Sequence, residues 1–142
     1  MITTLALDLE GTLLSNAMSQ IPRPGLYDFL VGCEALFGRI VIFTAVAELR
    51  FRSIAALLAA EGHAPGWFAD IEYVQWNGET KDLTYVHGVE PGEVLLVDDL
   101  QEYVHPGQED QWVRVAPFVA PYSSSDDGLR TVLQTLAARR SA

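Results

Sequence analysis

Six polar residues with reactive side chains lie at the ends of apolar runs of the sequence or between two such runs. They are Asp8, Glu10, Thr44, Lys81, Asp98 and Asp99. Asp8 and Glu10 follow the run ITTLAL, and the two adjacent aspartates follow VLLV. Thr44 ends the run VIFT, and Lys81 is the only lysine of the chain. Four acids, one hydroxyl and one ammonium form a set that suits acid–base chemistry and the binding of a cation.

The carboxylates of this set would repel one another if they lay close together. A divalent cation and one positive side chain relieve such repulsion, and a site with only oxygen ligands suits Mg²⁺. Asp8 and Glu10 are two residues apart, so in an extended chain both point to the same side. A carboxylate beside a metal and a lysine can accept a phosphoryl group. A second carboxyl can then protonate the leaving oxygen and later deprotonate water.

The elements that must position these residues alternate along the chain. Short apolar runs predict strands at 2–8, 39–44, 72–76, 93–97 and 111–115, and apolar spacing predicts helices at 26–37, 47–61 and 126–139. This order favours an α/β fold around a mostly parallel sheet. Right-handed crossovers would place the ends of the first, second and fourth strands side by side. Ligands bind at that carboxyl edge in open α/β sheets, so we expect the site there.

The motifs resemble those of the haloacid dehalogenase (HAD) superfamily. Four match in order: DLEGT at 8–12, VIFT at 41–44, Lys81, and VDD at 97–99. The chain also resembles the small NLI-interacting-factor-like phosphatases, which are related to the RNA polymerase II carboxyl-terminal-domain phosphatases. RPGLYDFL at 23–30 and VLLVDDLQEYV at 94–104 carry this likeness. The resemblance implies a three-layer Rossmann-like HAD fold with no large cap domain, over residues 3 to 138.

The resemblance also implies a role for each of the six residues. Asp8 would be the nucleophile and a Mg²⁺ ligand. Glu10 would be the general acid and base, and would give the metal a backbone oxygen. Thr44 and Lys81 would hold the phosphoryl group. Asp99 would bind Mg²⁺, and Asp98 would be either a further ligand or the partner of Lys81.

Two positions depart from the pattern of that family. The second acid is Glu10 where the family has Asp, so the carboxyl reaches further from the backbone. Gly11 stands where the eukaryotic phosphatases have Glu, which weakens the transfer of their polymerase-tail substrate to this chain.

Length and charge limit the organisation and the partners. The 142 residues predict one HAD-like hydrolase domain over 1–142, with 63–80 as a small insertion beside the site. The net charge of −10 argues against nucleic acid and anionic membranes as partners. The N-terminal sequence has no basic segment before its first acid, and no apolar run is long enough for a membrane span, so we expect a cytoplasmic protein. Nothing in the sequence indicates an oligomeric state.

The sequence therefore predicts a Mg²⁺-dependent phosphomonoester hydrolase that acts through an aspartyl phosphate on Asp8. A phosphoprotein carrying phosphoserine or phosphothreonine is the leading substrate. One alternative is a phosphatase for nucleotides or nucleic-acid ends. Another is a phospho-ligand binding module with little turnover, which only Glu10 favours. The aromatic residues of the 63–80 segment would either contact substrate or, as we favour, pack in the core; they are Trp67, Phe68, Tyr73 and Trp76.

Overall fold

Five strands and three α-helices make up the main elements of the computed structural model, which describes residues 1–141. The strands are β1 (Thr4–Leu7), β2 (Arg39–Ile42), β3 (Glu72–Tyr73), β4 (Val94–Asp98) and β5 (Trp112–Arg114). The helices are α1 (Leu26–Leu36), α2 (Glu48–Ala60) and α3 (Gly128–Ser141). Each predicted helix and strand is present, with ends that differ by a few residues. Short 3₁₀ helices in the connections are the elements that the sequence did not predict.

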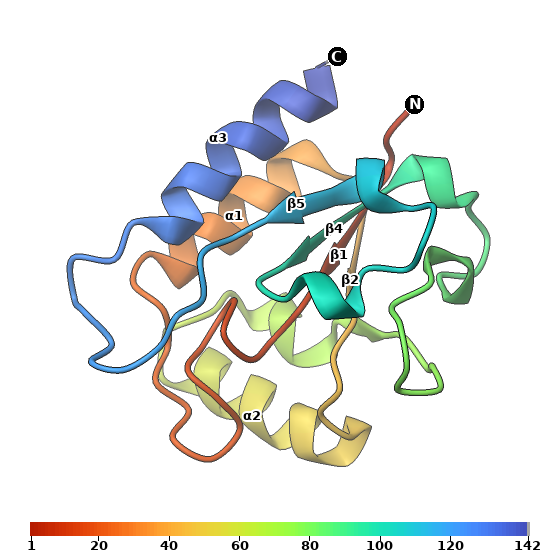
Figure 1. Cartoon of the computed structure of the whole chain (residues 1–142). Coiled ribbons are helices and arrows are strands. Elements are labelled where there is room, and N and C mark those ends of the chain that lie inside the picture. The colour runs from red at the N-terminus through yellow and green to blue at the C-terminus, as the bar shows by residue number, and fades with distance from the viewer. Residues whose placement is uncertain (142) are drawn as a thin grey trace.

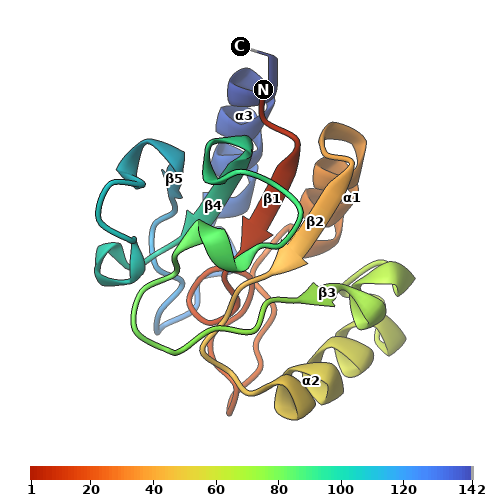
Figure 2. The same cartoon turned by 90° about the vertical axis from the view of Figure 1, so that its right-hand side faces the viewer.

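The five strands form one parallel sheet in the order β3-β2-β1-β4-β5. Leu7 of β1 lies beside Ile42 of β2 and Val97 of β4. The predicted adjacency of the first, second and fourth strands is therefore confirmed. Strands β1 and β4 are buried along their whole length, so their sequences are almost entirely apolar. Their carboxyl ends meet at one edge of the sheet (Figure 2).

Helices α1 and α3 pack on each other and cover one face of the sheet (Figure 1). Leu7 and Val97 project from the sheet into this core, where they share one cluster with Phe29 of α1 and Leu136 of α3. Helix α2 joins the same core through Phe51.

The other face of the sheet is covered by the segment between β3 and β4. Leu83 and Val86 of this segment pack against Ala6, Val41 and Leu96. A 3₁₀ helix, η2 (Leu83–Tyr85), lies here where a larger α/β protein has an α-helix. This layer is thin. The segment that forms it also passes close to the carboxyl edge of the sheet. Among the helices of residues 1–141, none has the length and apolar character that crossing a membrane requires.

Candidate active site

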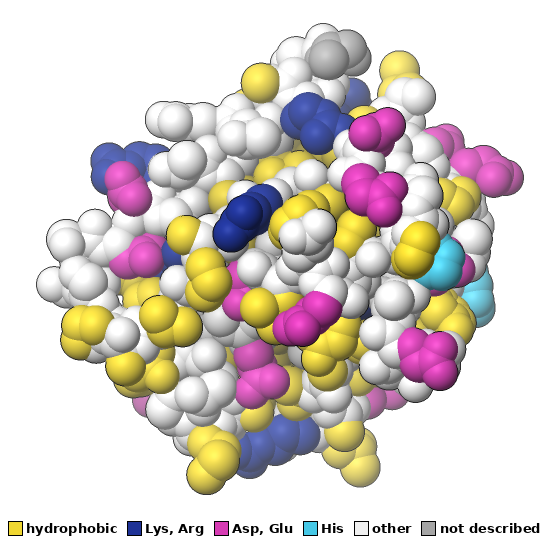
Figure 3. Space-filling model, viewed as in Figure 1, with side chains coloured by type: hydrophobic (Ala, Val, Ile, Leu, Met, Phe, Trp, Pro, Cys, Tyr) yellow, Lys and Arg dark blue, Asp and Glu magenta, His cyan; other side chains and the backbone are white. Residues whose placement is uncertain are grey.

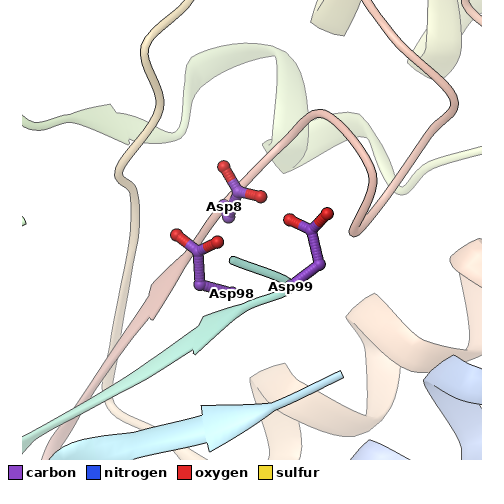
Figure 4. Close-up of side chains that lie close together, drawn as sticks. All are labelled: Asp8, Asp98 and Asp99. Carbon is purple, nitrogen blue, oxygen red and sulfur yellow. The ribbon is translucent and has the colours of Figure 1, made fainter. Parts of the chain in front are cut away.

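The three aspartates of the predicted site lie together at the carboxyl edge of the sheet (Figure 4). Asp8 directly follows β1, Asp98 is the last residue of β4, and Asp99 comes next. One carboxylate oxygen from each lies within 4.8 Å of the other two, and all three side chains are buried. The parallel register of β1 and β4 produces this arrangement, because both strands end at the same level.

Lys81 reaches the cluster from the segment that covers the sheet. Its Nζ donates to Asp8 Oδ1 at 2.8 Å and to Asp98 Oδ2 at 2.5 Å, and its side chain is fully buried. The backbone N–H of Lys81 donates to the carbonyl of Tyr103, which fixes this part of the chain beside the turn after β4. The only lysine of the chain therefore lies between two of the predicted carboxylates.

Thr12 is a site residue to which the sequence analysis assigned no role. Its hydroxyl lies 2.8 Å from Asp8 Oδ2 and 3.3 Å from Asp99 Oδ1, and its side chain is buried. The threonine is part of the DLEGT motif, so the signal was present in the sequence. Its contact with Asp99 joins residues 87 positions apart and could not be inferred from spacing.

Thr44 lies at the carboxyl edge of the sheet, two residues beyond the end of β2. Phe43 still donates to Leu7 O, so the strand-like course continues to the level of Asp8. The buried Thr44 hydroxyl accepts the backbone N–H of Val46 at 3.1 Å, and its carbonyl accepts the indole N–H of Trp76 at 2.8 Å.

Glu10 is the predicted residue whose carboxylate lies apart from the other acids. Its Oε2 accepts the backbone N–H of Ala17 at 2.7 Å, and the side chain is half-buried. The carbonyl of Ala17 in turn accepts from Arg50 at 2.6 Å. The loop after β1 thus binds the Glu10 carboxyl through Oε2. The other oxygen, Oε1, forms no hydrogen bond with the described residues.

The aromatic residues of the 63–80 segment mostly pack inside the protein. Phe68 is fully buried and contacts Phe51 of α2 at a ring-centroid distance of 5.8 Å. The Tyr73 hydroxyl donates to the carbonyl of Val46 at 2.5 Å. Trp67 and Trp76 are half-buried, and Trp76 borders the site through Thr44.

Burial governs the charge of the cluster. Removal from water raises the pKa of Asp8 to about 6, although the charge of Lys81 opposes the shift. Burial also raises the pKa of Asp98 and of Asp99. Burial alone would lower the pKa of Lys81, but the charges of Asp8 and Asp98 outweigh it and hold that pKa above its usual value. One lysine faces three acids, so ionisation of all three leaves surplus negative charge.

This donor set fits Mg²⁺. All of its ligand atoms are carboxylate oxygens, which a hard divalent cation prefers, and the surplus charge is of the sign that a cation offsets. The residues that could hold the ion through their side chains are Asp8, Asp98 and Asp99. Glu10 could contribute its backbone oxygen, since its carboxylate is bonded to the loop.

A comparison with protein-family models matches residues 3–141 to the NLI interacting factor-like phosphatases. The chain belongs to this phosphatase family. The match spans nearly the whole sequence and confirms the family that the motifs indicated. A comparison with curated proteins found no match.

Solved structures extend this result to the fold. Two structures of Fcp1, an RNA polymerase II CTD phosphatase, are 14% identical to the chain with a TM-score of 0.61; one of them is a variant of the fission yeast protein bound to beryllium fluoride. They align with 99% of this chain, which spans only about half of the Fcp1 chains (51% and 50%). A hypothetical protein from Xanthomonas campestris is also 14% identical over 99% of this chain and 84% of its own, with a TM-score of 0.50.

The likeness to Fcp1 confirms the predicted HAD fold for this NLI interacting factor-like phosphatase. Within residues 1–141 the connections between strands hold no large cap, as expected.

Proposed function

We propose that this phosphatase is a Mg²⁺-dependent phosphomonoester hydrolase in which Asp8 accepts the phosphoryl group. The observation that carries the proposal is the setting of the Asp8 carboxylate. Lys81 donates to one of its oxygens, the Thr12 hydroxyl donates to the other, and Asp98 and Asp99 lie beside it. This arrangement aligns a nucleophile and brings the oxygen ligands that fit a divalent cation to the same place.

The proposed reaction has two steps, both on Asp8. A carboxylate oxygen attacks phosphorus, the bond between phosphorus and the ester oxygen breaks, and Glu10 gives its proton to the leaving oxygen. Glu10 then takes a proton from water, which attacks the aspartyl phosphate and releases inorganic phosphate. Bound Mg²⁺ would offset the charge of the phosphoryl oxygens. Lys81 and Thr44 would hold those oxygens in place during both steps.

The bond from Ala17 suits Glu10 for this role. It fixes one oxygen of the carboxyl, so the other stays free to carry the proton. The same bond favours a second candidate function, a phospho-ligand binding module with little turnover. In that case Glu10 would remain bonded to the loop and would not reach the leaving oxygen.

A phosphoprotein is the substrate class that we propose. The described chain has no large cap over the carboxyl edge of the sheet, so a phosphorylated side chain on a polypeptide could approach it. Fcp1 is a polymerase CTD phosphatase, and it shares this fold. Phosphoserine or phosphothreonine in a peptide is therefore the natural first choice.

We also propose that residues 1–142 form one catalytic domain in which 63–80 is a small insertion beside the site. Phe68 of this segment packs in the core of the sheet, and Trp76 bonds to Thr44. Both contacts tie the segment to the rest of the chain.

Release of phosphate from p-nitrophenyl phosphate, with Mg²⁺ or with EDTA, tests the mechanism. We expect turnover that requires Mg²⁺ and falls about a thousandfold or more in Asp8→Asn, because the nucleophile is lost. The matched control is Asp28→Asn, which removes an exposed carboxylate of α1 and should leave the rate unchanged.

A single-turnover measurement on Glu10→Gln separates the two candidates. An acid–base role for Glu10 contributes a factor of about 10² to 10⁴ to the rate, so phosphoenzyme should accumulate in this variant.

Turnover that survives Asp8→Asn would contradict the covalent mechanism. A folded wild-type protein that binds Mg²⁺ and phosphate but releases no product would favour the binding module.

A further inference from the structure

Two of the three tryptophans donate their indole N–H to backbone carbonyls at the carboxyl edge of the sheet. Trp76 Nε1 donates to Thr44 O at 2.8 Å, and Trp112 Nε1 donates to Asp98 O at 3.0 Å. The third, Trp67, has a buried Nε1 that bonds to none of the described residues. Two indoles thus hold the backbone of residues that the proposed function places in the site, one on each side of β1.

The Thr44 carbonyl lies where the sheet no longer supplies a donor. The pairing of β2 with β3 ends at Ile42 and Tyr73, and Val74 makes the last backbone bond, to Ile42 O. A buried carbonyl without a partner is costly, so another group must take over at this point. The Trp76 indole does so and extends the bonding of β2 to the level of the site.

The Asp98 carbonyl has a comparable position on the other side. Val115 N approaches it at 3.3 Å, which is long for a backbone bond, and the Trp112 indole adds the shorter contact of 3.0 Å. Asp98 is also the residue whose carboxylate bonds Lys81. The orientation of that carboxylate toward the cluster therefore depends on a fixed position of the Asp98 backbone.

Trp76 also borders Lys81 through an aromatic neighbour. Its ring meets the ring of Tyr103 edge-on, with centroids 5.9 Å apart and planes at 83°. The Tyr103 ring centroid lies 5.0 Å from Lys81 Nζ, and the Tyr103 carbonyl accepts the Lys81 backbone N–H at 2.7 Å. One indole is therefore connected to both residues that would hold the phosphoryl group: it bonds the Thr44 carbonyl directly and reaches Lys81 through the Tyr103 ring.

We propose that Trp76 and Trp112 are positioning residues, whose indole N–H groups fix the backbone of Thr44 and Asp98 on either side of Asp8. The inference rests on the proposed function, because that function assigns Thr44 to the phosphoryl group and Asp98 to the metal. A positioning effect acts on the chemistry itself, so it has the same size for small and large substrates. A tryptophan that contacted the substrate would affect only the larger ones.

The variants Trp76→Phe and Trp112→Phe keep an aromatic ring and remove the donor. Trp67→Phe makes the same chemical change where the donor has no partner, so it is the matched control. We expect kcat/KM to fall about tenfold in each of the two test variants, since small errors of placement at a site are costly. The fall should be equal for p-nitrophenyl phosphate and for a phosphoserine peptide, and Trp67→Phe should stay within about twofold of wild type.

Calorimetry supplies a readout that does not need turnover. Trp112→Phe should bind Mg²⁺ more weakly, and Trp76→Phe should bind beryllium fluoride more weakly in the presence of Mg²⁺, both measured against Trp67→Phe. Melting temperatures close to that of Trp67→Phe verify folding. Should Trp76→Phe fail to fold, Trp112→Phe tests the inference on the other side of Asp8.

Kinetics and affinities equal to those of Trp67→Phe would overturn the inference, and so would an effect confined to the peptide substrate. Failure of the proposed function has a different signature, because the wild-type protein would then lack turnover that depends on Mg²⁺ and Asp8. The calorimetric comparison still decides the inference in that case.

Discussion

Gly11 controls how closely the loop after β1 approaches the aspartate cluster. Its φ is +74°, in the left-handed region that side chains rarely adopt, and a Cβ at this position would overlap Asp99 Oδ2. This contact gives a geometric reason for the glycine, which the sequence analysis noted only as a departure from the eukaryotic phosphatases. In this chain the Asp99 carboxylate occupies the space that a side chain at residue 11 would need.

Replacing Gly11 by alanine should therefore damage the site as well as the fold. We expect Gly11→Ala to lose about 1–2 kcal/mol of unfolding free energy from backbone strain, and at least about tenfold in kcat/KM from displacement of Asp99. Urea unfolding and phosphate release measure the two effects. Gly62→Ala is the control, because its φ is +79° but nothing lies near its Cβ. Equal activity of the two variants would refute the role of this contact.

Among the elements, Arg23 links helices α1 and α3 to the loop that follows β1. It lies just before α1, and its fully buried guanidinium forms two hydrogen bonds with Asp126, just before α3, at 2.8 and 3.1 Å. It also approaches the carbonyls of Gly11 and Thr12 at 3.4 and 3.3 Å. The position of Thr12, and through it that of Asp8, therefore depends on an ion pair outside the site.

Removal of the Asp126 charge should destabilise the protein, because it leaves the Arg23 charge buried without a partner. We expect Asp126→Asn to lose about 3 kcal/mol of unfolding free energy at pH 7. The matched control is Glu72→Gln, which breaks an exposed pair with Arg39 at 2.9 and 2.6 Å and should lose less than about 1 kcal/mol. Urea unfolding of both variants compares them directly, and equal losses would contradict the argument.

The same pair makes stability depend on acidic pH. Burial alone would raise the pKa of Asp126, but its bonds to Arg23 and to the Gly128 N–H outweigh this and lower that pKa below 3.8. The stabilisation is therefore complete above the usual carboxyl pKa and disappears as the pH falls through the lowered one. Between pH 5 and pH 3 the wild type should lose more stability than Asp126→Asn, which has no such group to titrate.

The sequence predicted the elements well wherever a local pattern defined them. The apolar runs located all five strands, and the spacing of apolar residues located all three helices. Helix α3 begins at Gly128, two residues later than predicted, because the Asp126 carboxylate caps Gly128 N and bonds Arg23. The predicted strand at 72–76 ends at Tyr73, and beyond Val74 the bond to β2 comes from the Trp76 side chain, which donates to the Thr44 carbonyl.

The aspartate cluster was predictable because the carboxyl ends of parallel strands meet at one edge of the sheet. The resemblance of the motifs to a known family also indicated which residues belong to the cluster. The contacts that support the cluster were not predictable. Arg23 and Asp126 are 103 residues apart, and Trp76 and Thr44 are 32 apart. No short-range pattern records which distant carbonyl or carboxylate a buried donor will meet, since packing of the whole chain decides it. The proposed roles of the six predicted residues remain predictions.

For the whole molecule, the net charge of −10 matters because the aspartate cluster of the candidate site is paired with a single buried cation, Lys81. Figure 3 shows acidic side chains over the centre and the right-hand side of the face that it presents. A phosphate ester approaches a protein of this net charge against a repulsion that acts before any contact forms. The range of that repulsion is about 30 Å at 0.01 M salt and about 8 Å at 0.15 M.

Salt should therefore change the rate in opposite directions for two kinds of phosphopeptide. Raising the ionic strength from 0.01 to 0.15 M at constant Mg²⁺ should increase kcat/KM severalfold for a peptide with acidic residues beside the phosphoserine. For a peptide with basic residues at the same positions, kcat/KM should decrease. Equal salt responses of the two peptides would show that the overall charge does not guide substrate approach.

The ion pair between Arg23 and Asp126 also bears on biosynthesis. Asp8 leaves the ribosome long before Asp126, so a nascent chain already carries the residue that would accept a phosphoryl group. Its loop is not yet fixed, however, because the partner of Arg23 has still to be made. The site is thus completed late in translation, and a chain that stops short of Asp126 exposes the motif without the ion pair that anchors it.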